Sequence, residues 1–155
     1  MGRFGLDPSR VAYEWHPYLS TSFAADRELE ADLEYIHTLI IRFEQGSAKL
    51  PLGEAHRIED LAAAIGRITK VRSAVRVAIT GHTDEIGGDE VNVKLSVDRA
   101  VSVSQALAAE GIPPSLFSVT GVGNSLPLRT GGGEWDKATN RSVSFRVDPG
   151  PAPGR

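Results

Sequence analysis

The chain has 155 residues, of which 41% are hydrophobic, and this length and composition suit one domain with a core rather than two. Its 17 Lys and Arg residues against 20 Asp and Glu residues give a net charge of −3, which excludes long-range attraction to nucleic acid or to an anionic membrane. The absence of cysteine excludes disulfides, thiolate metal sites and a cysteine nucleophile, and it suits cytosol and periplasm equally.

Residues 1–36 are predicted to form an extension that ends in a short helix with Leu29, Leu33 and Ile36 on one face. A free linker is rarely aromatic, so we expect the extension to pack on the domain or on neighbouring sequence. The segment lacks the basic start and apolar run of a secretory signal, and no apolar run in the chain approaches the length of a membrane span. The aromatic residues of the extension are Phe4, Tyr13, Trp15, Tyr18 and Phe23.

The domain proper is predicted to begin at His37 with a strand followed by a helix. In the segment TLIIRF, residues 38–43, apolar side chains alternate onto one side, which is typical of a strand. The next apolar residues recur at helical spacing, and such a stripe has to cover a sheet. The residues of this stripe are Ile58, Leu61, Ala62, Ile65 and Ile68.

A second strand and a second helix follow. The segment AVRVAIT, residues 74–80, places Val75, Val77 and Ile79 on one face. The helix is expected to start at Asp89 to Asn92 and to end near Glu110, because Gly111 can adopt the left-handed conformation that caps a helix. Its buried line is predicted to be Ala100, Val103 and Leu107.

Two more strands are predicted at residues 115–123 and 141–147. In the last strand we expect alternating valine and phenylalanine side chains to point inward and Ser142, Ser144 and Arg146 to point outward, which leaves one sheet face exposed to solvent. The connection LPLRTGGGEWDKAT is predicted to be a loop with mobile glycines at 131–133. The Pro- and Gly-rich tail, residues 149–155, is predicted to be disordered.

The order of elements is therefore βαβαββ. Right-handed crossovers make the strands joined through helices parallel, and the last strand arrives by a loop and is expected to be antiparallel. This predicts an α/β two-layer sandwich with the helices on one face of a mixed four-stranded sheet, occupying residues 37–148.

Opposite charges are expected at one edge of this sheet. Asp84 follows the end of the second strand, and ligand clefts in open α/β sheets lie beyond the carboxyl ends of the strands. Asn92, Ser96 and Arg99 share one stripe of the next helix. Asp84 and Arg99 can therefore face a common cleft, where they either pair with each other or hold a ligand that carries both an ammonium and a carboxylate.

Residue chemistry alone favours the ion pair. The small residues around Asp84 favour the interpretation as a ligand site. Gly81, Gly87 and Gly88 have no side chains, so a ligand can approach the backbone, and Thr83 adds a hydroxyl. Turn geometry also explains these glycines, so both interpretations stay open at this level.

Four motifs resemble those of the OmpA-like domain, the peptidoglycan-associating module shared by OmpA, the Pal lipoprotein and MotB. They are ITGHTDEIG, NVKLSVDRAVSV, VTGVGNSLP and ATNRSV, and they occur in this order within residues 37–147. The chain departs from the family at Ser142 and Ser144, where members commonly have an arginine and an acid. The stretch RTGGGEWDK has no counterpart in the motifs.

The resemblance implies noncovalent binding of the peptidoglycan stem peptide at the zwitterionic end of meso-diaminopimelate. By the family's motif, Asp84 takes the ammonium and Arg99 takes the carboxylate. Asn140 and Arg141 match a motif that we interpret as mainly structural, bracing the last strand near the cleft. The remaining expected contacts are Thr83, Asn92, backbone N–H groups near Leu95, and Phe43 as a wall of the pocket.

The resemblance also implies a periplasmic or cell-envelope protein that anchors an envelope component to the wall, with no catalysis, cofactor, metal or nucleic acid. A membrane tether is expected outside this fragment of a larger exported or membrane-anchored protein. A homodimer stays open, as in the stator-type members. The alternative is a structural or protein-interaction adaptor that keeps the fold without wall binding and uses its aromatic N-terminal segment.

Two further alternatives are weaker. A hydrolase using Ser96 or Thr83 with His82 lacks a nucleophile elbow, and adjacent side chains in an extended segment point to opposite sides. A calcium loop made of the acids at 84, 85, 89 and 90 departs from the EF-hand spacing, and His16, His37 and His56 are too scattered to suggest a transition-metal site.

Overall fold

A computed structural model describes residues 17–84 and 86–154, and it describes side chains from residue 24 onward. The expected packing of the N-terminal aromatic residues therefore lies outside the described part. The elements, in chain order, are α2 (Pro17–Thr38), β1 (Ile40–Arg42), the 3₁₀ helix η1 (Leu52–Glu54), α3 (Ala55–Val71), β2 (Arg76–Gly81), α4 (Asp89–Ala109), η2 (Pro114–Leu116), β3 (Phe117–Gly121), α5 (Glu134–Asn140) and β4 (Ser142–Asp148).

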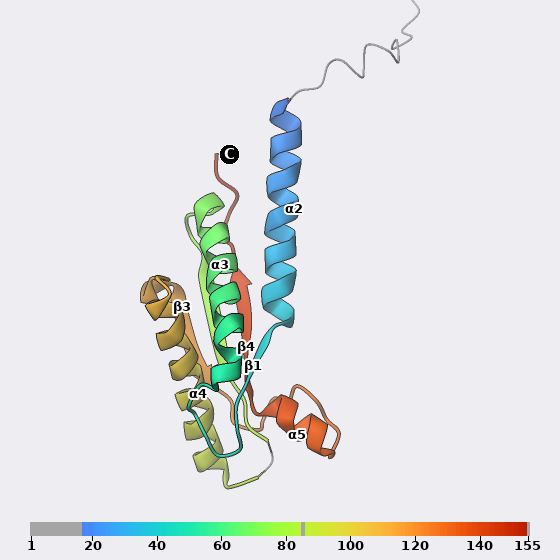
Figure 1. Cartoon of the computed structure of the whole chain (residues 1–155), viewed down its shortest axis with the longest axis vertical. Coiled ribbons are helices and arrows are strands. Elements are labelled where there is room, and N and C mark those ends of the chain that lie inside the picture. Colours follow the sequence, from blue (N-terminus) through green and yellow to red (C-terminus); the bar gives the residue numbers. More distant parts are fainter. Residues whose placement is uncertain (1–16, 85, 155) are drawn as a thin grey trace, which may run out of the picture.

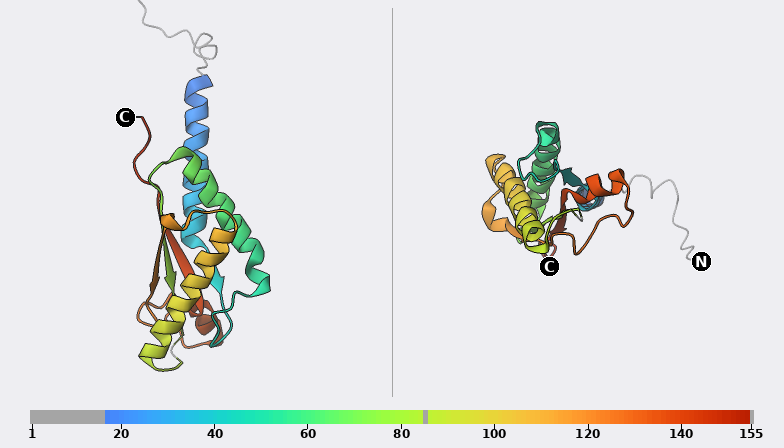
Figure 2. Two further views of the ribbon diagram at one scale, coloured as in Figure 1. Left: turned by 90° about the vertical axis from the view of Figure 1, so that its left-hand side faces the viewer. Right: turned by 90° about the horizontal axis from the view of Figure 1, so that it is seen from below.

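The strands form one mixed sheet of four in the order β1-β4-β2-β3. β2 and β3 run parallel, as a helical crossover requires, and β4 is antiparallel to both β1 and β2. Helices α3 and α4 lie side by side on one face of the sheet (Figures 1 and 2). The predicted α/β sandwich is thereby confirmed.

The core lies between the sheet and these helices. The side chains predicted to form the inner lines of β1, β2, β4, α3 and α4 are all buried, whereas Leu33 of α2 is half-buried. Each fully buried aliphatic side chain contributes about 1.5–3 kcal/mol to folding. Helix α4 ends one residue before the expected position, and Gly111 has a φ of 95°, as expected of a left-handed cap.

Two glycines allow α4 to lie unusually close to the sheet. A Cβ at Gly81, the last residue of β2, would overlap the backbone carbonyl oxygen of Ser96, and a Cβ at Gly121 would overlap the Ser96 side chain and the backbone nitrogen of Val97. Gly81 was expected to give a ligand access to the backbone. Gly81 instead makes room for α4, and this close approach places the polar stripe of α4 directly beside the end of β2.

Helix α2 is longer than the predicted short helix and covers an edge of the sheet. Leu29 and Ile36 pack into the core, and α2 contacts both α3 and β4. The backbone N–H of Val147 donates to Nε2 of His37 at 3.0 Å, where β1 is too short to pair with β4. Within the described residues, no helix combines the length and apolar character needed to cross a membrane.

The predicted loop between β3 and β4 contains helix α5, and one face of the sheet is less exposed than expected. Ser142 was expected to point into solvent but is fully buried, whereas Arg146 is exposed as predicted. The reason is that the β3–β4 connection crosses this end of the second face: the carbonyl of Leu126 lies 3.0 Å from Nδ1 of His82, and Trp135 lies over Arg42.

Candidate functional site

Asp84 lies just beyond β2 with its carboxylate held from two sides. Oδ1 accepts the backbone N–H of Ile86 at 3.1 Å, and Oδ2 accepts Nη1 of Arg141 at 3.1 Å. The side chain is only 6% exposed. The carboxylate is therefore fixed in position, and its partner is Arg141 rather than the Arg99 considered from the sequence.

Arg99 is 1% exposed and points from α4 toward the loop that follows β1. Its guanidinium donates to three backbone carbonyls: Nε to Ser47 at 2.8 Å, Nη1 to His82 at 3.0 Å and Nη2 to Glu44 at 3.0 Å. Burial lowers the pKa of Arg99 to about 10, with the charge of Asp84 acting in the opposite direction, so the group remains a cation at neutral pH.

Asp84 and Arg99 line one pocket of about 130 Å³, and within the described chain no hydrogen bond or ion pair joins them. Asn92 and Thr83 also line it, and both are almost completely buried. The hydroxyl of Thr83 has no hydrogen-bond partner among the residues that the structure describes. The other lining residues are Gln45, Gly46, Ile86, Val91 and Leu95.

Two expected contacts have other roles. Phe43 does not line the pocket; it is buried, and its ring lies beneath Arg99, with the guanidinium carbon 5.5 Å from the ring centre. Leu95 lines the pocket, but it lies in the second turn of α4, where backbone N–H groups are bonded within the helix and are not free for a ligand.

Arg141 was expected to be mainly structural, but it binds the Asp84 carboxylate directly. Besides Asp84 it binds Glu134 at 3.1 Å, and its Nε has no partner among the described residues. Burial lowers the pKa of Arg141, but hydrogen bonds to Asp84 and Glu134 outweigh this effect and raise it overall. The antiparallel pairing of Gly81 with Val143 carries Arg141 past the end of β2, so the β4 register is the signal that would have found it.

Asn140 was expected to brace the last strand, but the bonds of its side chain run to the β3–β4 connection. Its side chain accepts the backbone N–H of Arg129 at 2.9 Å and donates to the carbonyl of the same residue at 2.8 Å. This pair of bonds fixes the β3–β4 connection to the end of α5.

His82 is a buried histidine with both ring nitrogens occupied. A carbonyl can only accept, so Nδ1 donates to Leu126 at 3.0 Å and Nε2 accepts from the Ser144 hydroxyl at 2.8 Å. Burial lowers the pKa of His82, which favours this neutral form. Neither nitrogen is left to act as a base toward Thr83. No cluster of three or more His, Asp or Glu side chains suited to a metal ion occurs in residues 17–84 and 86–154.

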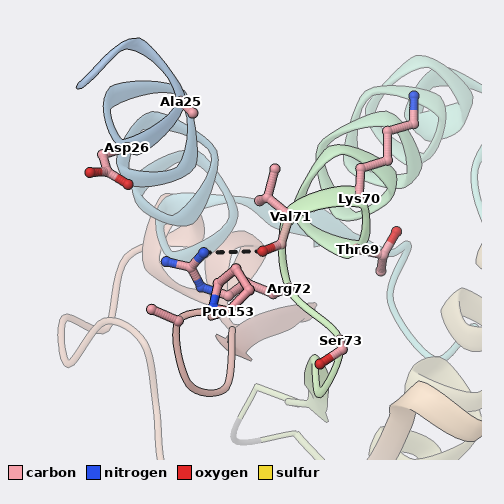
Figure 3. Close-up of a pocket in the computed structure, with 9 residues that line it drawn as sticks. Ala25, Asp26, Thr69, Lys70, Val71, Arg72, Ser73 and Pro153 are labelled. Carbon is pink, nitrogen blue, oxygen red and sulfur yellow. Dashed lines mark hydrogen bonds between the residues drawn. The ribbon is translucent and has the colours of Figure 1, made fainter. Parts of the chain in front are cut away.

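A larger cavity, of about 600 Å³, lies at the other end of α3, between α2 and the C-terminal segment (Figure 3). Its lining includes Asp26, Lys70 and Arg72, but the Lys70 ammonium points away from Arg72, and Nη1 of Arg72 donates to the carbonyl of Val71. This cavity contains none of the residues of the four sequence motifs, unlike the pocket at Asp84.

Comparison with known proteins yields consistent relatives. The chain is 32% identical over 144 residues to the peptidoglycan-associated lipoprotein of Pseudomonas aeruginosa, covering 92% of this chain and 78% of that protein. It is 41% identical over 75 residues to outer membrane porin F of Pseudomonas fluorescens, but these are 48% of this chain and only 23% of the porin. The crystal structure of the peptidoglycan-associated lipoprotein from Burkholderia pseudomallei superposes with a TM-score of 0.64 at 23% identity, over 70% of this chain and 89% of that one.

These relatives agree with the expected periplasmic or cell-envelope location. The model of the family described as "OmpA family" matches residues 42–141, which lie within the range 37–147 that carries the sequence motifs. The chain belongs to the OmpA family.

Proposed function

We propose that the chain binds cell-wall peptidoglycan without covalent chemistry, by enclosing the zwitterionic end of meso-diaminopimelate in the pocket between Asp84 and Arg99. The observation that carries the proposal is that two opposite charges line one small pocket without pairing with each other. The association of a full-length relative with peptidoglycan, stated in its name, supports the same ligand class.

Both charged groups retain capacity for a ligand. A guanidinium has five N–H donors, and Arg99 uses three on backbone carbonyls, so one N–H on each Nη atom remains for a carboxylate. The Asp84 carboxylate offers about four acceptor positions and uses two, which leaves room for an ammonium. The hydroxyl of Thr83, which has no partner in the described part of the chain, supplies a further hydrogen bond.

The affinity for one stem peptide is expected to be modest. A charge-assisted hydrogen bond contributes roughly 1.5–3 kcal/mol before the costs of ordering and desolvation are subtracted. Stem peptides recur along the polymer, so several copies of the protein held in one assembly each bind one stem. The combined binding of these copies retains the assembly on the wall. We further propose that the domain works together with a membrane tether.

The decisive variant is Asp84→Asn, which keeps the side-chain shape and removes the charge. We expect it to abolish measurable binding of free meso-diaminopimelate by calorimetry and to prevent pelleting with isolated sacculi. The matched control is Asp98→Asn, which removes an acid from the exposed face of α4 and should bind like the wild type. Thermal unfolding shows whether each variant is folded.

If a folded Asp84→Asn variant pellets with sacculi and binds diaminopimelate as the wild type does, the proposal is refuted. This result would favour the adaptor alternative, in which the fold contacts a protein partner instead. Release of new products from muropeptides by the purified protein would favour an enzyme. The engagement of both His82 nitrogens supports binding without turnover.

A further inference from the structure

Trp135 is a large aromatic residue that the core does not use. It lies at the second position of α5 and is 63% exposed. The guanidinium carbon of Arg42 lies 5.0 Å from the centre of its ring. Arg42 thus supports the indole from the sheet, while most of the ring surface remains open to solvent.

The indole is held in place rather than mobile on its own. Arg42 belongs to β1 and is half-buried, so the cation beneath the ring is positioned by the sheet. Helix α5 is fixed at its end by the two bonds between Asn140 and Arg129, and Arg129 also binds Asp136 at 2.6 Å. Little entropy is lost when a ligand contacts a side chain that is already ordered.

A continuous chain of contacts joins this ring to the pocket. Asp84 binds Arg141 at 3.1 Å, Arg141 binds Glu134 at 3.1 Å, and Glu134 is the residue before Trp135. Figures 1 and 2 show α5 at the same end of the domain as the loop between β2 and α4. Helix α5 is therefore within reach of a polymer anchored in the pocket.

We propose that Trp135 is a stacking platform for an N-acetylated sugar ring of the glycan strand whose stem peptide occupies the pocket. The C–H faces of a pyranose suit the electron-rich face of an indole. Diaminopimelate is the third residue of the stem, and its side-chain end is the part in the pocket, so an extended stem holds the sugar roughly 10 Å or more from the pocket. The sugar thus lies outside the pocket, on the surrounding surface. This inference rests on the proposed function and adds a second subsite to it.

The experiment uses two soluble wall fragments: the L-Ala–D-Glu–diaminopimelate tripeptide, and the same tripeptide attached to the N-acetylglucosamine–N-acetylmuramic acid disaccharide. We expect Trp135→Ala to weaken binding of the disaccharide–tripeptide roughly three- to tenfold and to leave the tripeptide unchanged. Trp135→Phe, which keeps an aromatic face, should stay within about twofold of the wild type for both.

A direct reading comes from fluorescence. The chain has two tryptophans, so a Trp15→Phe protein reports on Trp135 alone. Its emission should change with the disaccharide–tripeptide and not with the tripeptide.

The matched control for the binding measurements is Val71→Ala, which shortens an exposed apolar side chain beside the cavity of Figure 3. This variant should bind both fragments like the wild type.

Equal weakening of both fragments by Trp135→Ala, or no weakening of either, would overturn the inference. A change in oligomeric state by Trp135→Ala with unchanged sugar binding would overturn it in favour of a protein contact. The two proposals fail separately: if Asp84→Asn binds both fragments normally while Trp135→Ala weakens only the disaccharide–tripeptide, the platform stands and the pocket assignment falls.

Discussion

The β2–α4 junction, residues 81–99, lines the candidate pocket, and the β3–β4 connection, residues 122–141, reaches it through the bond of Arg141 to Asp84. Different forces hold these two regions. The junction depends on steric contact between Gly81 and α4 and on buried bonds from Arg99 to the backbone. The connection depends largely on side-chain ion pairs, such as that of Arg129 with Asp136, whose side chains are 54% and 19% exposed. The two regions should therefore respond differently to mutation.

The largest expected effect is that of Gly81→Ala. The new Cβ would overlap the carbonyl oxygen of Ser96, and because this is backbone, α4 has to move as a unit. We expect the free energy of unfolding, measured by urea titration, to fall by about 3 kcal/mol or more.

The matched control is Gly66→Ala in α3, where an added Cβ meets nothing within 4 Å. This variant should gain about 0.5–1 kcal/mol, because alanine favours the helix. Equal effects of the two substitutions would show that the close approach of α4 is not what fixes the junction.

The next largest effect should come from Arg99→Ala. It leaves three backbone carbonyls without their donor, and each unsatisfied buried group costs roughly 1–3 kcal/mol. Because water can enter part of the space that the arginine side chain leaves, we expect the free energy of unfolding to fall by about 3 kcal/mol in total. Binding loss in this variant therefore has to be separated from loss of stability. This is why Asp84→Asn is the better test of the pocket.

Arg129→Ala provides the comparison within the connection. Because its ion pair with Asp136 is partly exposed, we expect a loss below about 1 kcal/mol that shrinks further at high salt. A loss from Arg129→Ala as large as that from Arg99→Ala would remove the distinction between the two regions.

The smallest effect concerns His82, which joins the two regions. Burial lowers its pKa below the ordinary value of 6.5, so the unfolded chain takes up a proton first as the pH falls. The contribution of His82 to stability is therefore present above pH 6.5 and is lost as the pH falls from 6.5 toward the lowered pKa. His82→Asn should make the decline in unfolding free energy between pH 7 and pH 5 shallower, and an unchanged slope would contradict this role.

The elements that were predicted correctly are those whose pattern is repeated along the sequence. The helical spacing of residues 58–68 and the strand alternation of residues 75–79 each leave one face that has to be buried, and all of these inner side chains are buried. In the same way, the stripe containing Asn92 and Arg99 placed both residues correctly on the pocket side of α4.

The features that were missed depend on contacts between distant segments. Helix α5 has seven residues after three glycines, too short for a periodic pattern to stand out. The burial of Ser142 follows from the connection that crosses it, and the ion pair of Asp84 with Arg141 joins residues 57 positions apart. Neither can be read from local spacing.

The packing of α2 on the core and on β4 has a consequence for where the folding unit begins. A truncation at residue 37, the boundary that the strand pattern suggests, would remove Leu29 and Ile36 from the core. It would also remove most of the helix that contacts β4. Because β1 pairs only with Ser142 to Ser144, the N–H and C=O groups along the rest of that side of β4 would then be open to a strand from another molecule. Helix α2 thus protects β4 from strand pairing between molecules, and a fragment that folds on its own has to include α2.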